Sequence, residues 1–423
     1  AWGMRMTGIA QEPELAFLPW DIALEDWPED TVVALPRGIS RHIVRFVKIN
    51  GIVYAVKEIE EHFANREYEL LADLKQRRIP SVEGVAVVTE RVDADGEALP
   101  AALITRHLAF SLPYRALFSS SLRLETANRL LDALAVLIVQ LHLVGFSWND
   151  CSLSNTLFVR DATAFAAYLV DAETGELHER LSDGQRRYDL ETAAVNVTGE
   201  LMDLAAGDRL HEGIDPIETG VSIQDRYTRL WDEITKPISF TRADRFQLEK
   251  HMRKLNDLGF DIAELSVEAD GEHVRVQPKV VDTGHHTRRL IRLTGLDTEE
   301  RQAQRLLLDL DSYRMKLGLG PEDEELAAHR WVTDRFELVM SEVPQSLRGK
   351  LEPAQIFHEV LEHRWFMSEK AGKSVQFEAA VADYVQNVLA KKPDEAAVLG
   401  AKPGNDLEDT QVLRIVLPPE NSW

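Results

Sequence analysis

The sequence predicts a mixed α and β protein in which a small antiparallel sheet with one inserted helix precedes a longer, mainly helical region. Residues 31–59 combine short alternating apolar runs with the dipeptide Asn50-Gly51, and both of these residues tolerate the positive φ of a tight hairpin. In residues 125–143 the apolar side chains instead recur every three or four positions, which is the spacing of one helix face. The change of period indicates an α+β architecture.

The composition is that of an ordinary globular protein with an acidic surface. Hydrophobic residues make up 44% and charged residues 28% of the 423 residues, a length that suggests two or three domains. The formal net charge of −23 repels a phosphate backbone and an anionic membrane. Extended nucleic-acid binding is therefore not expected.

The cysteine content and the longest apolar run bear on the location of the protein. Cys151 is the single cysteine, so no intrachain disulfide forms and nothing requires an oxidising compartment. The longest apolar run, Leu130–Leu143, is short for a membrane span and is broken by polar side chains such as Asp132. The first residues contain no apolar signal core. We expect a cytoplasmic, bacterial-type enzyme without a transmembrane segment.

Strand and turn signals dominate the first hundred residues. Residues 42–49 alternate between two faces, and the hairpin at Asn50-Gly51 returns the chain into the next strand. Helical spacing follows from His62 to about Gln76 and is bounded by Pro80. The expected strands are 31–35, 42–49, 52–59, 85–89 and 101–105.

Helices dominate the remainder, with short strands between them. Helix 125–143 is expected to stop at Gly145, and a loop over 147–154 leads into strands 156–160 and 167–171. Residues 261–272 are a weak linker or a strand edge, and 274–281 alternate like a strand. Further helices are expected near 190–204, 223–234, 242–258, 298–313, 322–341, 353–368 and 376–390. The stretch from 391 onward is rich in proline, glycine and charge, and we expect a flexible tail.

A lysine on the third strand is the first candidate for chemistry. Lys57 lies in Ala55-Val56-Lys57, which is similar to the Val-Ala-Ile-Lys strand that holds nucleotide phosphates in protein kinases. Such a lysine needs a carboxylate partner, for which Glu67 and Glu69 compete. They lie about 200° apart around a helix, so only one can face the sheet. The apolar stripe through Leu70 and Leu71 favours Glu67.

The polar loop after the long helix is the second candidate. Asp150 and Asn155 are five residues apart, which is the spacing of the kinase catalytic-loop Asp and Asn. An apolar strand follows directly, and a second apolar strand ends in Asp171. Phosphoryl transfer needs a lysine on the phosphates, a carboxylate for the attacking hydroxyl, and Asn and Asp ligands for Mg²⁺. The chain offers these groups in that order.

These segments resemble the kinase-like superfamily branch that includes lipopolysaccharide (Kdo/heptose) kinases, RIO-type kinases and aminoglycoside phosphotransferases. More closely, the chain resembles a bacterial kinase-like family of unknown function beside the lipopolysaccharide kinases. The resemblance covers roughly Leu24 to Leu204. The matching stretches are Leu35–His42, Ala55–Ile59, Arg66–Leu71, Gly145–Phe158 and Leu169–Glu173.

The resemblance implies a role for each motif residue. Asp150 corresponds to the catalytic Asp, Asn155 and Asp171 to Mg²⁺ ligands, and Lys57 to the lysine paired with Glu67. The implied cofactors are ATP and Mg²⁺. The segment 103–107 corresponds to the hinge whose backbone meets adenine, and its expected nucleotide contacts are Thr105 and His107.

Three departures from the kinase pattern bear on catalysis. The glycine-rich loop is reduced to Gly38, for which side-chain donors of Arg37, Ser40 or Arg41 can compensate. Trp148 stands two residues before Asp150, where kinases usually have His. The Asp-Phe-Gly triplet is Asp171-Ala172-Glu173, and its extra acid is a further candidate metal ligand.

A basic segment in the C-terminal half is the last candidate. Arg288, Arg289 and Arg292 lie within eight residues that contain no acid, so they are candidates to hold an anionic substrate. Arg288 and Arg292 would share one face of a helix. The competing interpretation is that these arginines pair with the chain's own acids.

The sequence thus predicts a bilobal, protein-kinase-like α+β fold with an additional, mainly helical C-terminal domain. The expected parts are a sheet lobe at 24–103, a helical lobe at 104–260, a C-terminal domain at 261–390 and the tail at 391–423. The expected function is transfer of phosphate from ATP to a hydroxyl of a small molecule, sugar or protein. The alternative is a nucleotide-binding pseudokinase that acts as a regulatory or scaffold module. The C-terminal domain is a candidate surface for a protein partner.

Overall fold

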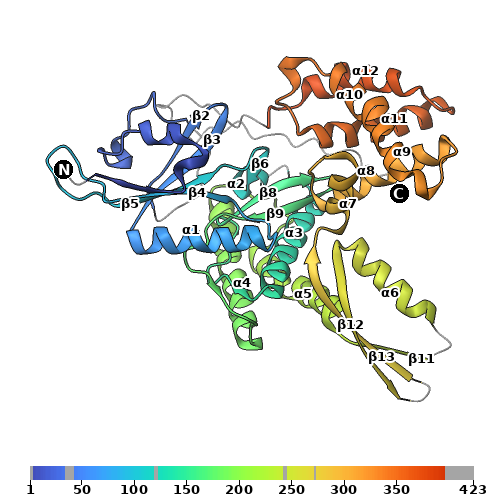
Figure 1. Ribbon diagram of the computed structural model, residues 1–423, viewed down its shortest axis with the longest axis horizontal. Helices are drawn as coiled ribbons and strands as arrows, with labels where there is room; N and C mark the ends of the chain where they lie inside the picture. Colours follow the sequence, from blue (N-terminus) through green and yellow to red (C-terminus); the bar gives the residue numbers. More distant parts are fainter. Residues whose placement is uncertain (1–2, 34–41, 119–121, 242–244, 271–272, 396–423) are drawn as a thin grey trace. The chain divides into compact units, whose positions relative to one another are not determined.

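The computed structural model describes residues 3–33, 42–118, 122–241, 245–270 and 273–395 (Figure 1). Contacts within the chain divide the described residues into two units. The first contains the residues up to Val159 together with Ala167–Tyr227, and the second contains Arg160–Ala166 and the residues from Thr228 onward.

The first unit begins with a five-stranded antiparallel sheet in the order β1-β4-β5-β3-β2. Its hairpin is the one predicted from Asn50-Gly51: Ile49 pairs with Ile52, and Asn50 and Gly51 both have positive φ. The strands are β1 (Arg5–Thr7), β2 (Val44–Ile49), β3 (Ile52–Ile59), β4 (Glu83–Thr89) and β5 (Ala101–Arg106).

The two faces of this sheet are covered differently. Helix α1 (Glu61–Gln76) contacts β4 and β5 on one face (Figure 1). The other face packs on the short turns η1 (Ile9–Gln11), η2 (Pro13–Phe17) and η3 (Leu24–Asp26), with Trp20 and Trp27 in the shared core. The sheet lobe therefore begins before the expected residue 24, because the N-terminal segment supplies both an edge strand and one side of the core.

The helical part of the first unit is built around α3 (Leu124–Leu143). This helix is long and apolar enough to cross a membrane, but 67% of its apolar window is buried inside the structure, as expected for a core helix. Gly145 ends it with φ +83°, and a Cβ there would lie 2.0 Å from the carbonyl oxygen of His178. The accompanying elements are β6 (Ser111–Pro113), α2 (Tyr114–Leu117), β7 (Phe146–Ser147), β8 (Thr156–Asp161), β9 (Ala164–Leu169), β10 (Glu176–Leu177) and α4 (Asp183–Ala206).

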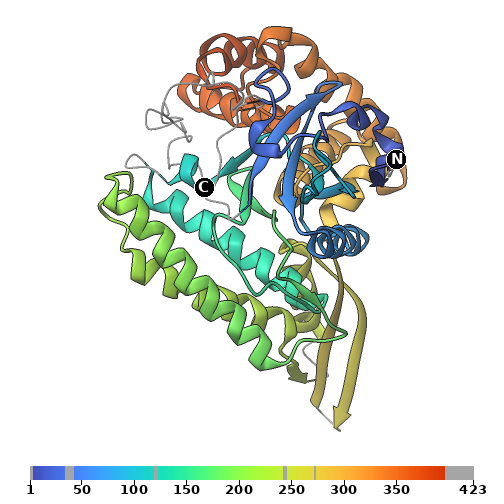
Figure 2. The same ribbon diagram turned by 90° about the vertical axis from the view of Figure 1, so that its left-hand side faces the viewer.

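The second unit joins a three-stranded sheet to a group of helices. Its sheet has the order β11-β13-β12, and its two longest strands form one antiparallel hairpin (Figure 2). The sheet elements are β11 (Ile238–Thr241), β12 (Phe260–Asp270) and β13 (His273–Thr283), with α6 (Arg245–Asp257) beside them. Helix α5 (Pro216–Thr235) enters this unit from the first. The alternation predicted a strand for 274–281, which lies in β13, and the stretch expected as a weak linker or strand edge forms β12 up to Asp270. The remaining helices of this unit follow these strands.

The helices of the second unit enclose an aromatic core. Trp331 and Phe357 meet edge to face with ring centroids 5.2 Å apart, and Phe336 and Phe377 complete the cluster. The helices are α7 (His285–Thr294), α8 (Glu300–Lys316), α9 (Glu324–Trp331), α10 (Glu337–Glu342), α11 (Pro353–Ala371) and α12 (Phe377–Asn387). Short 3-10 turns lie at η4 (Pro321–Asp323), η6 (Gln345–Leu347) and η7 (Leu389–Lys391), and η5 (Val332–Phe336) is a π-helical segment between α9 and α10. The mainly helical C-terminal region is therefore present.

The start of the expected tail is an ordered part of the second unit. Lys392 forms an ion pair with Glu359 (2.8 Å), and Glu395 forms one with Arg160 (2.8 Å). The prediction of a flexible segment from 391 was thus wrong for 391–395, because charged residues in a proline-rich stretch can have buried partners. Residues 396–423 lie outside the described residues.

Candidate functional site

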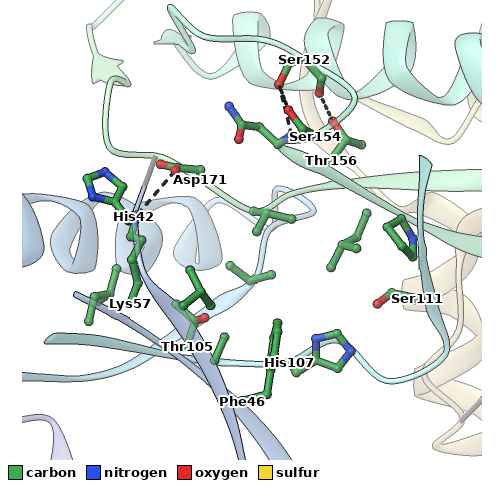
Figure 3. Close-up of a pocket in the computed structure, with 18 of the residues that line it drawn as sticks. His42, Phe46, Lys57, Thr105, His107, Ser111, Ser152, Ser154, Thr156 and Asp171 are labelled. Atoms are coloured by element: carbon green, nitrogen blue, oxygen red, sulfur yellow. Dashed lines mark hydrogen bonds and ion pairs between the residues drawn. The ribbon is translucent and has the colours of Figure 1, made fainter. Parts of the chain in front are cut away.

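A pocket of about 760 Å³ lies in the first unit between the sheet and the helical part. This volume is within the range of small-ligand and cofactor sites. The lining residues include the predicted Glu67, Asp150 and Asn155. The predicted Lys57, Asp171, Thr105 and His107 also line it and are labelled in Figure 3. Strands β3 and β5, helix α1, the loop before β8 and the segment after β9 thus bring the predicted groups to one cavity.

Lys57 and Glu67 form the innermost ion pair of the pocket. The Lys57 Nζ lies 2.5 Å from Glu67 Oε2, and the Glu67 side chain is only 1% exposed. The second Glu67 oxygen accepts a hydrogen bond from the backbone N–H of Ala172 (3.2 Å), so this carboxylate joins β3, α1 and the segment after β9. The structure therefore selects Glu67 over Glu69 as the partner of Lys57.

Three carboxylates surround the ammonium group of Lys57. Asp171 lies 3.5 Å and Glu173 3.9 Å from Nζ, and Glu67, Asp171 and Glu173 offer oxygens within 4.8 Å of one another. His42 Nε2 lies 2.7 Å from Glu173. Burial alone would lower the pKa of Lys57, but the surrounding carboxylates raise it above its ordinary value. Burial, together with the charge of Asp171, raises the pKa of Glu67 to about 7 despite its pairing with Lys57.

Asp150 is held by two side-chain amides. Asn155 Nδ2 donates to Asp150 Oδ2 (3.1 Å) and to the Asp150 carbonyl (3.1 Å), and Asn196 Nδ2 donates to Asp150 Oδ1 (3.3 Å). Asn149, directly before it, has φ 66°, a conformation that asparagine adopts more readily than most residues. Because the side-chain nitrogen of Asn155 donates to Asp150, the side-chain oxygen Oδ1 of Asn155 is the atom that remains for a cation.

Helix α4 supplies three anchors for this loop that sequence reasoning missed. Asp189 accepts hydrogen bonds from the backbone N–H groups of Trp148 (2.8 Å) and Asn149 (2.7 Å). Glu200 accepts from the backbone N–H groups of Leu153 and Ser154 (both 2.8 Å), and Asn196 contacts Asp150. Asp189, Asn196 and Glu200 lie seven and four positions apart, and each directly precedes a buried apolar residue of α4, namely Leu190, Val197 and Leu201. This polar stripe beside a buried stripe was the available signal.

The departures from the kinase pattern have structural explanations in this loop. The Trp148 indole is 1% exposed, and its Nε1 donates a hydrogen bond to the backbone carbonyl of Asp171 (3.1 Å). Trp148 therefore links the loop to the segment that follows β9. Gly175 packs directly on Phe146, where a Cβ would lie 2.2 Å from the ring. Cys151 is buried, and burial raises the pKa of its thiol well above the ordinary value, which opposes a role as a nucleophile.

The two nucleotide contacts expected near the hinge, Thr105 and His107, lie inside and after strand β5, respectively. Thr105 lies inside β5, between Ala55 of β3 and Gly84 of β4, so most of the expected hinge is a central strand. His107 follows the strand, and its backbone N–H donates to the Val53 carbonyl (2.9 Å). Gly38, Ser40 and Arg41 lie outside the described residues.

The basic segment lies elsewhere, on α7 of the second unit. Arg289 forms ion pairs with Glu324 (2.5 Å) and Asp311 (3.2 Å), and Arg292 pairs with Glu324 (3.2 Å). Because both guanidinium groups already have carboxylate partners, the geometry favours the second interpretation, in which they hold helices together. Arg288 lies one position before Arg289 on the same helix.

Comparison with known families agrees with the division of the chain. Residues 44–197 match the lipopolysaccharide kinase (Kdo/WaaP) family, and residues 229–389 match a domain family of unknown function, DUF4032. No curated protein matches the sequence. A solved structure described as WaaP in complex with acyl carrier protein is 17% identical, with a TM-score of 0.35, over 60% of this chain and 99% of that one. The predicted resemblance to lipopolysaccharide kinases is confirmed, as is the kinase-like α+β class with a helical C-terminal region.

Proposed function

We propose that the first unit binds Mg²⁺–ATP in this pocket and transfers the terminal phosphoryl group to a hydroxyl of an acceptor. The observation that carries the proposal is the convergence of Lys57, Glu67, Asp150, Asn155 and Asp171 on one cavity. These are the side chains that phosphoryl transfer requires, and they come from elements in the kinase-like order.

Each group has a role that its contacts support. Lys57, fixed by Glu67, is placed to hold nucleotide phosphates. Asp150 is the group that would accept the proton of the attacking hydroxyl, and its two amide donors fix the orientation of its carboxylate. The acceptor class stays open between a small molecule, a sugar and a protein.

The donor set fits a magnesium ion. Asp171 and Glu173 supply carboxylate oxygens, Asn155 supplies an amide oxygen, and hard oxygen donors of this kind are what Mg²⁺ prefers. When bound, the ion would neutralise charge on the transferring phosphoryl group. The single buried cysteine fits a reducing, cytoplasmic setting, and the second unit is a candidate surface for a protein partner.

The direct test separates binding from turnover. Calorimetry with wild type should show Mg²⁺-dependent ATP binding that is strongly reduced in Asp171→Ala. Asp150→Asn should bind ATP nearly as wild type does, because this carboxylate addresses the acceptor rather than the nucleotide, but should lose phosphoryl transfer or ATP hydrolysis. If wild type binds ATP with no turnover above the Asp150→Asn background, the chain is a nucleotide-binding pseudokinase. If it binds no nucleotide, the proposal is wrong.

A further inference from the structure

Helix α2 contributes to the pocket an arginine that the proposed function does not use. Arg115 lines the same cavity as Asp150, Asn196 and Glu200. Its guanidinium carbon lies 5.4 Å from the ring centroid of Tyr114, which is itself buried. A molecule that enters the cavity can therefore contact both Asp150 and Arg115.

The charge of Arg115 lacks a carboxylate partner. Among the residues that the structure describes, its guanidinium forms no ion pair, and its buried Nε has no hydrogen-bond partner. In contrast, Arg91, Arg186 and Arg226 of the first unit each bind a carboxylate. A guanidinium stays charged at physiological pH, and a partly buried charge without a partner is costly. The side chain of Arg115 therefore indicates a contact with an anion.

The neighbours of Arg115 do not replace that anion. Burial raises the pKa of Tyr114 to about 12, so its hydroxyl, which is a hydrogen-bond partner of Arg115, stays neutral. Burial also raises the pKa of Glu200, and Arg115 is close enough to oppose this shift. However, both Glu200 oxygens accept backbone N–H groups, from Leu153 and Ser154 (both 2.8 Å). Glu200 thus holds the loop after Asp150 and forms no ion pair with Arg115 in the described part of the chain.

Helix α4 relates Arg115 to the group proposed to act on the acceptor. Asn196 donates to Asp150, and Glu200, four residues later, lies within electrostatic range of Arg115. Four residues of an α-helix advance about 6 Å. A small molecule can span such a distance, with a hydroxyl at Asp150 and an anionic group at Arg115.

We propose that Arg115 binds an anionic group of the acceptor, which is a small hydroxyl compound that also carries a carboxylate or a phosphate. The inference rests on the proposed phosphoryl transfer and names the charge class of its substrate. A planar guanidinium forms paired hydrogen bonds with either anion, so it orients the acceptor as well as binding it. In the transfer, the acceptor oxygen bonds to the terminal phosphorus of ATP, ADP leaves, and the hydroxyl proton passes to Asp150.

The charge of the acceptor is tested with small metabolites from a cell extract. An anion exchanger separates them into a retained and an unretained pool, and each pool is incubated with the full chain and γ-labelled Mg²⁺–ATP beside the protein fraction of the same extract. We expect labelled product, other than inorganic phosphate, from the retained pool only. Treatment of that pool with a phosphatase, removed before the assay, should abolish the transfer if the anion is a phosphate and spare it if the anion is a carboxylate.

Substitutions at Arg115 test the residue itself. Arg115→Gln removes the charge and should raise the apparent KM for the retained pool, expressed as its dilution, by about tenfold to hundredfold, the effect of losing a hydrogen bond to a charged group. The KM for ATP should change by less than about twofold. Arg115→Lys keeps the charge and should recover part of the loss. Arg187→Gln, the same change at an exposed arginine of α4 outside the pocket, is the matched control.

Three outcomes decide the question. Transfer confined to the retained pool, with a raised KM in Arg115→Gln, supports the inference. Transfer to the unretained pool or to proteins alone, or an unchanged KM in Arg115→Gln, overturns it while phosphoryl transfer stands. If wild type transfers phosphate to nothing in the extract, the proposed function fails first, and the inference fails with it. Melting temperatures without ligand show whether each variant is folded at the temperature of the assay.

Discussion

The two units each contain a cluster of charges that are wholly or partly buried, and the clusters differ in their balance of cations and carboxylates. Around Lys57 of the first unit, one ammonium group faces the carboxylates of Glu67, Asp171 and Glu173. In the second unit two cations face two carboxylates. Arg160 binds both oxygens of Glu395, and Lys392 binds Glu359, which also accepts a hydrogen bond from the Tyr384 hydroxyl (2.6 Å).

This difference distinguishes a cluster that binds a ligand from a cluster that only stabilises the fold. The second cluster has a formal charge of zero and its ionic groups satisfy one another, so it needs nothing further. At Lys57 one ammonium group instead faces three carboxyl groups, and Lys57, Glu67 and Asp171 line a cavity. Uncompensated charge is costly away from water, so the folded protein retains it where a ligand supplies the opposite charge. The Mg²⁺ ion of the proposed function would supply that charge.

The largest expected effect comes from breaking the balanced cluster. Glu395→Ala leaves the Arg160 guanidinium buried beside the lost partner, and removal of one member of a buried pair costs about 3–5 kcal/mol. Urea denaturation followed by circular dichroism measures the loss. The matched control replaces both charges, Arg160→Met with Glu395→Met, and should recover most of the stability because no charge is left unpaired. A loss of unfolding free energy below about 1 kcal/mol for Glu395→Ala would show that the Arg160–Glu395 pair does not stabilise the fold substantially.

The second prediction uses pH to contrast the clusters. The pKa of Glu67 is raised by burial from 4.5 in the unfolded chain to about 7, so the folded protein binds the extra proton between these values. Stability from this group is present at low pH and is lost as pH rises toward 7. Raising the pH from 5.5 to 8 should therefore cost roughly 2 kcal/mol through Glu67.

The balanced cluster should show no such loss. Burial alone would raise the pKa of Glu359, but Lys392, Tyr384 and Arg160 lower it below 4.5, so its contribution is complete above pH 4.5 and constant from 5.5 to 8. Denaturation of wild type and of Glu67→Gln at both pH values isolates the contribution of Glu67 to the pH dependence of the unfolding free energy. An equal pH dependence in both proteins would contradict the charge imbalance at Lys57.

The parts of the site that could be predicted from the sequence are those encoded over short distances. Asp150 and Asn155 lie in one loop, and Lys57 and Glu67 lie on a strand and the helix that follows it, so spacing and periodicity were sufficient. Asp189 and Glu200 could not be assigned, because they contact a loop about 40 residues earlier, and a helix with polar residues on one side is usually solvated there.

The balanced cluster is an even clearer case of contacts that local sequence patterns do not predict. Arg160 and Glu395 are 235 residues apart, and no local pattern distinguishes them from surface charges. Their pairing depends on how the second unit packs around the Arg160–Ala166 segment. Composition predicted a flexible segment from 391 because proline and charge usually remain solvated, and the buried partners of Lys392 and Glu395 reverse that preference.

A smaller effect of opposite sign is expected from relieving the unbalanced cluster. Asp171→Asn removes one of three neighbouring carboxylate charges while retaining an oxygen that can accept the Glu173 backbone N–H. Without ligand, the variant should be more stable than wild type by about 1 kcal/mol, since like charges are no longer held together. It should also lose the Mg²⁺–ATP-induced rise in melting temperature. The control Glu359→Gln, in the balanced cluster, should lower the unfolding free energy. If Asp171→Asn and Glu359→Gln both lower it, the two clusters do not differ in the way proposed.

The smallest effects are expected at the basic segment, where charges are balanced but exposed. Arg292 is 56% exposed in its pair with Glu324, and such pairs contribute about 0.5 kcal/mol or less, so Arg292→Ala should hardly change the unfolding free energy. Arg289 contacts both Asp311 and Glu324 and is less exposed, so Arg289→Ala should lower stability more than Arg292→Ala does.

A supporting role for this segment also predicts what does not change. Arg292→Ala and Arg289→Ala should bind Mg²⁺–ATP as wild type does and, once an acceptor is identified, should phosphorylate it normally at a temperature where both variants are folded. The opposite pattern, normal melting with a selective loss of acceptor phosphorylation, would mean that Arg289 and Arg292 bind substrate in spite of their acidic partners. The segment would then join the Lys57 cluster as a charged site completed by a ligand.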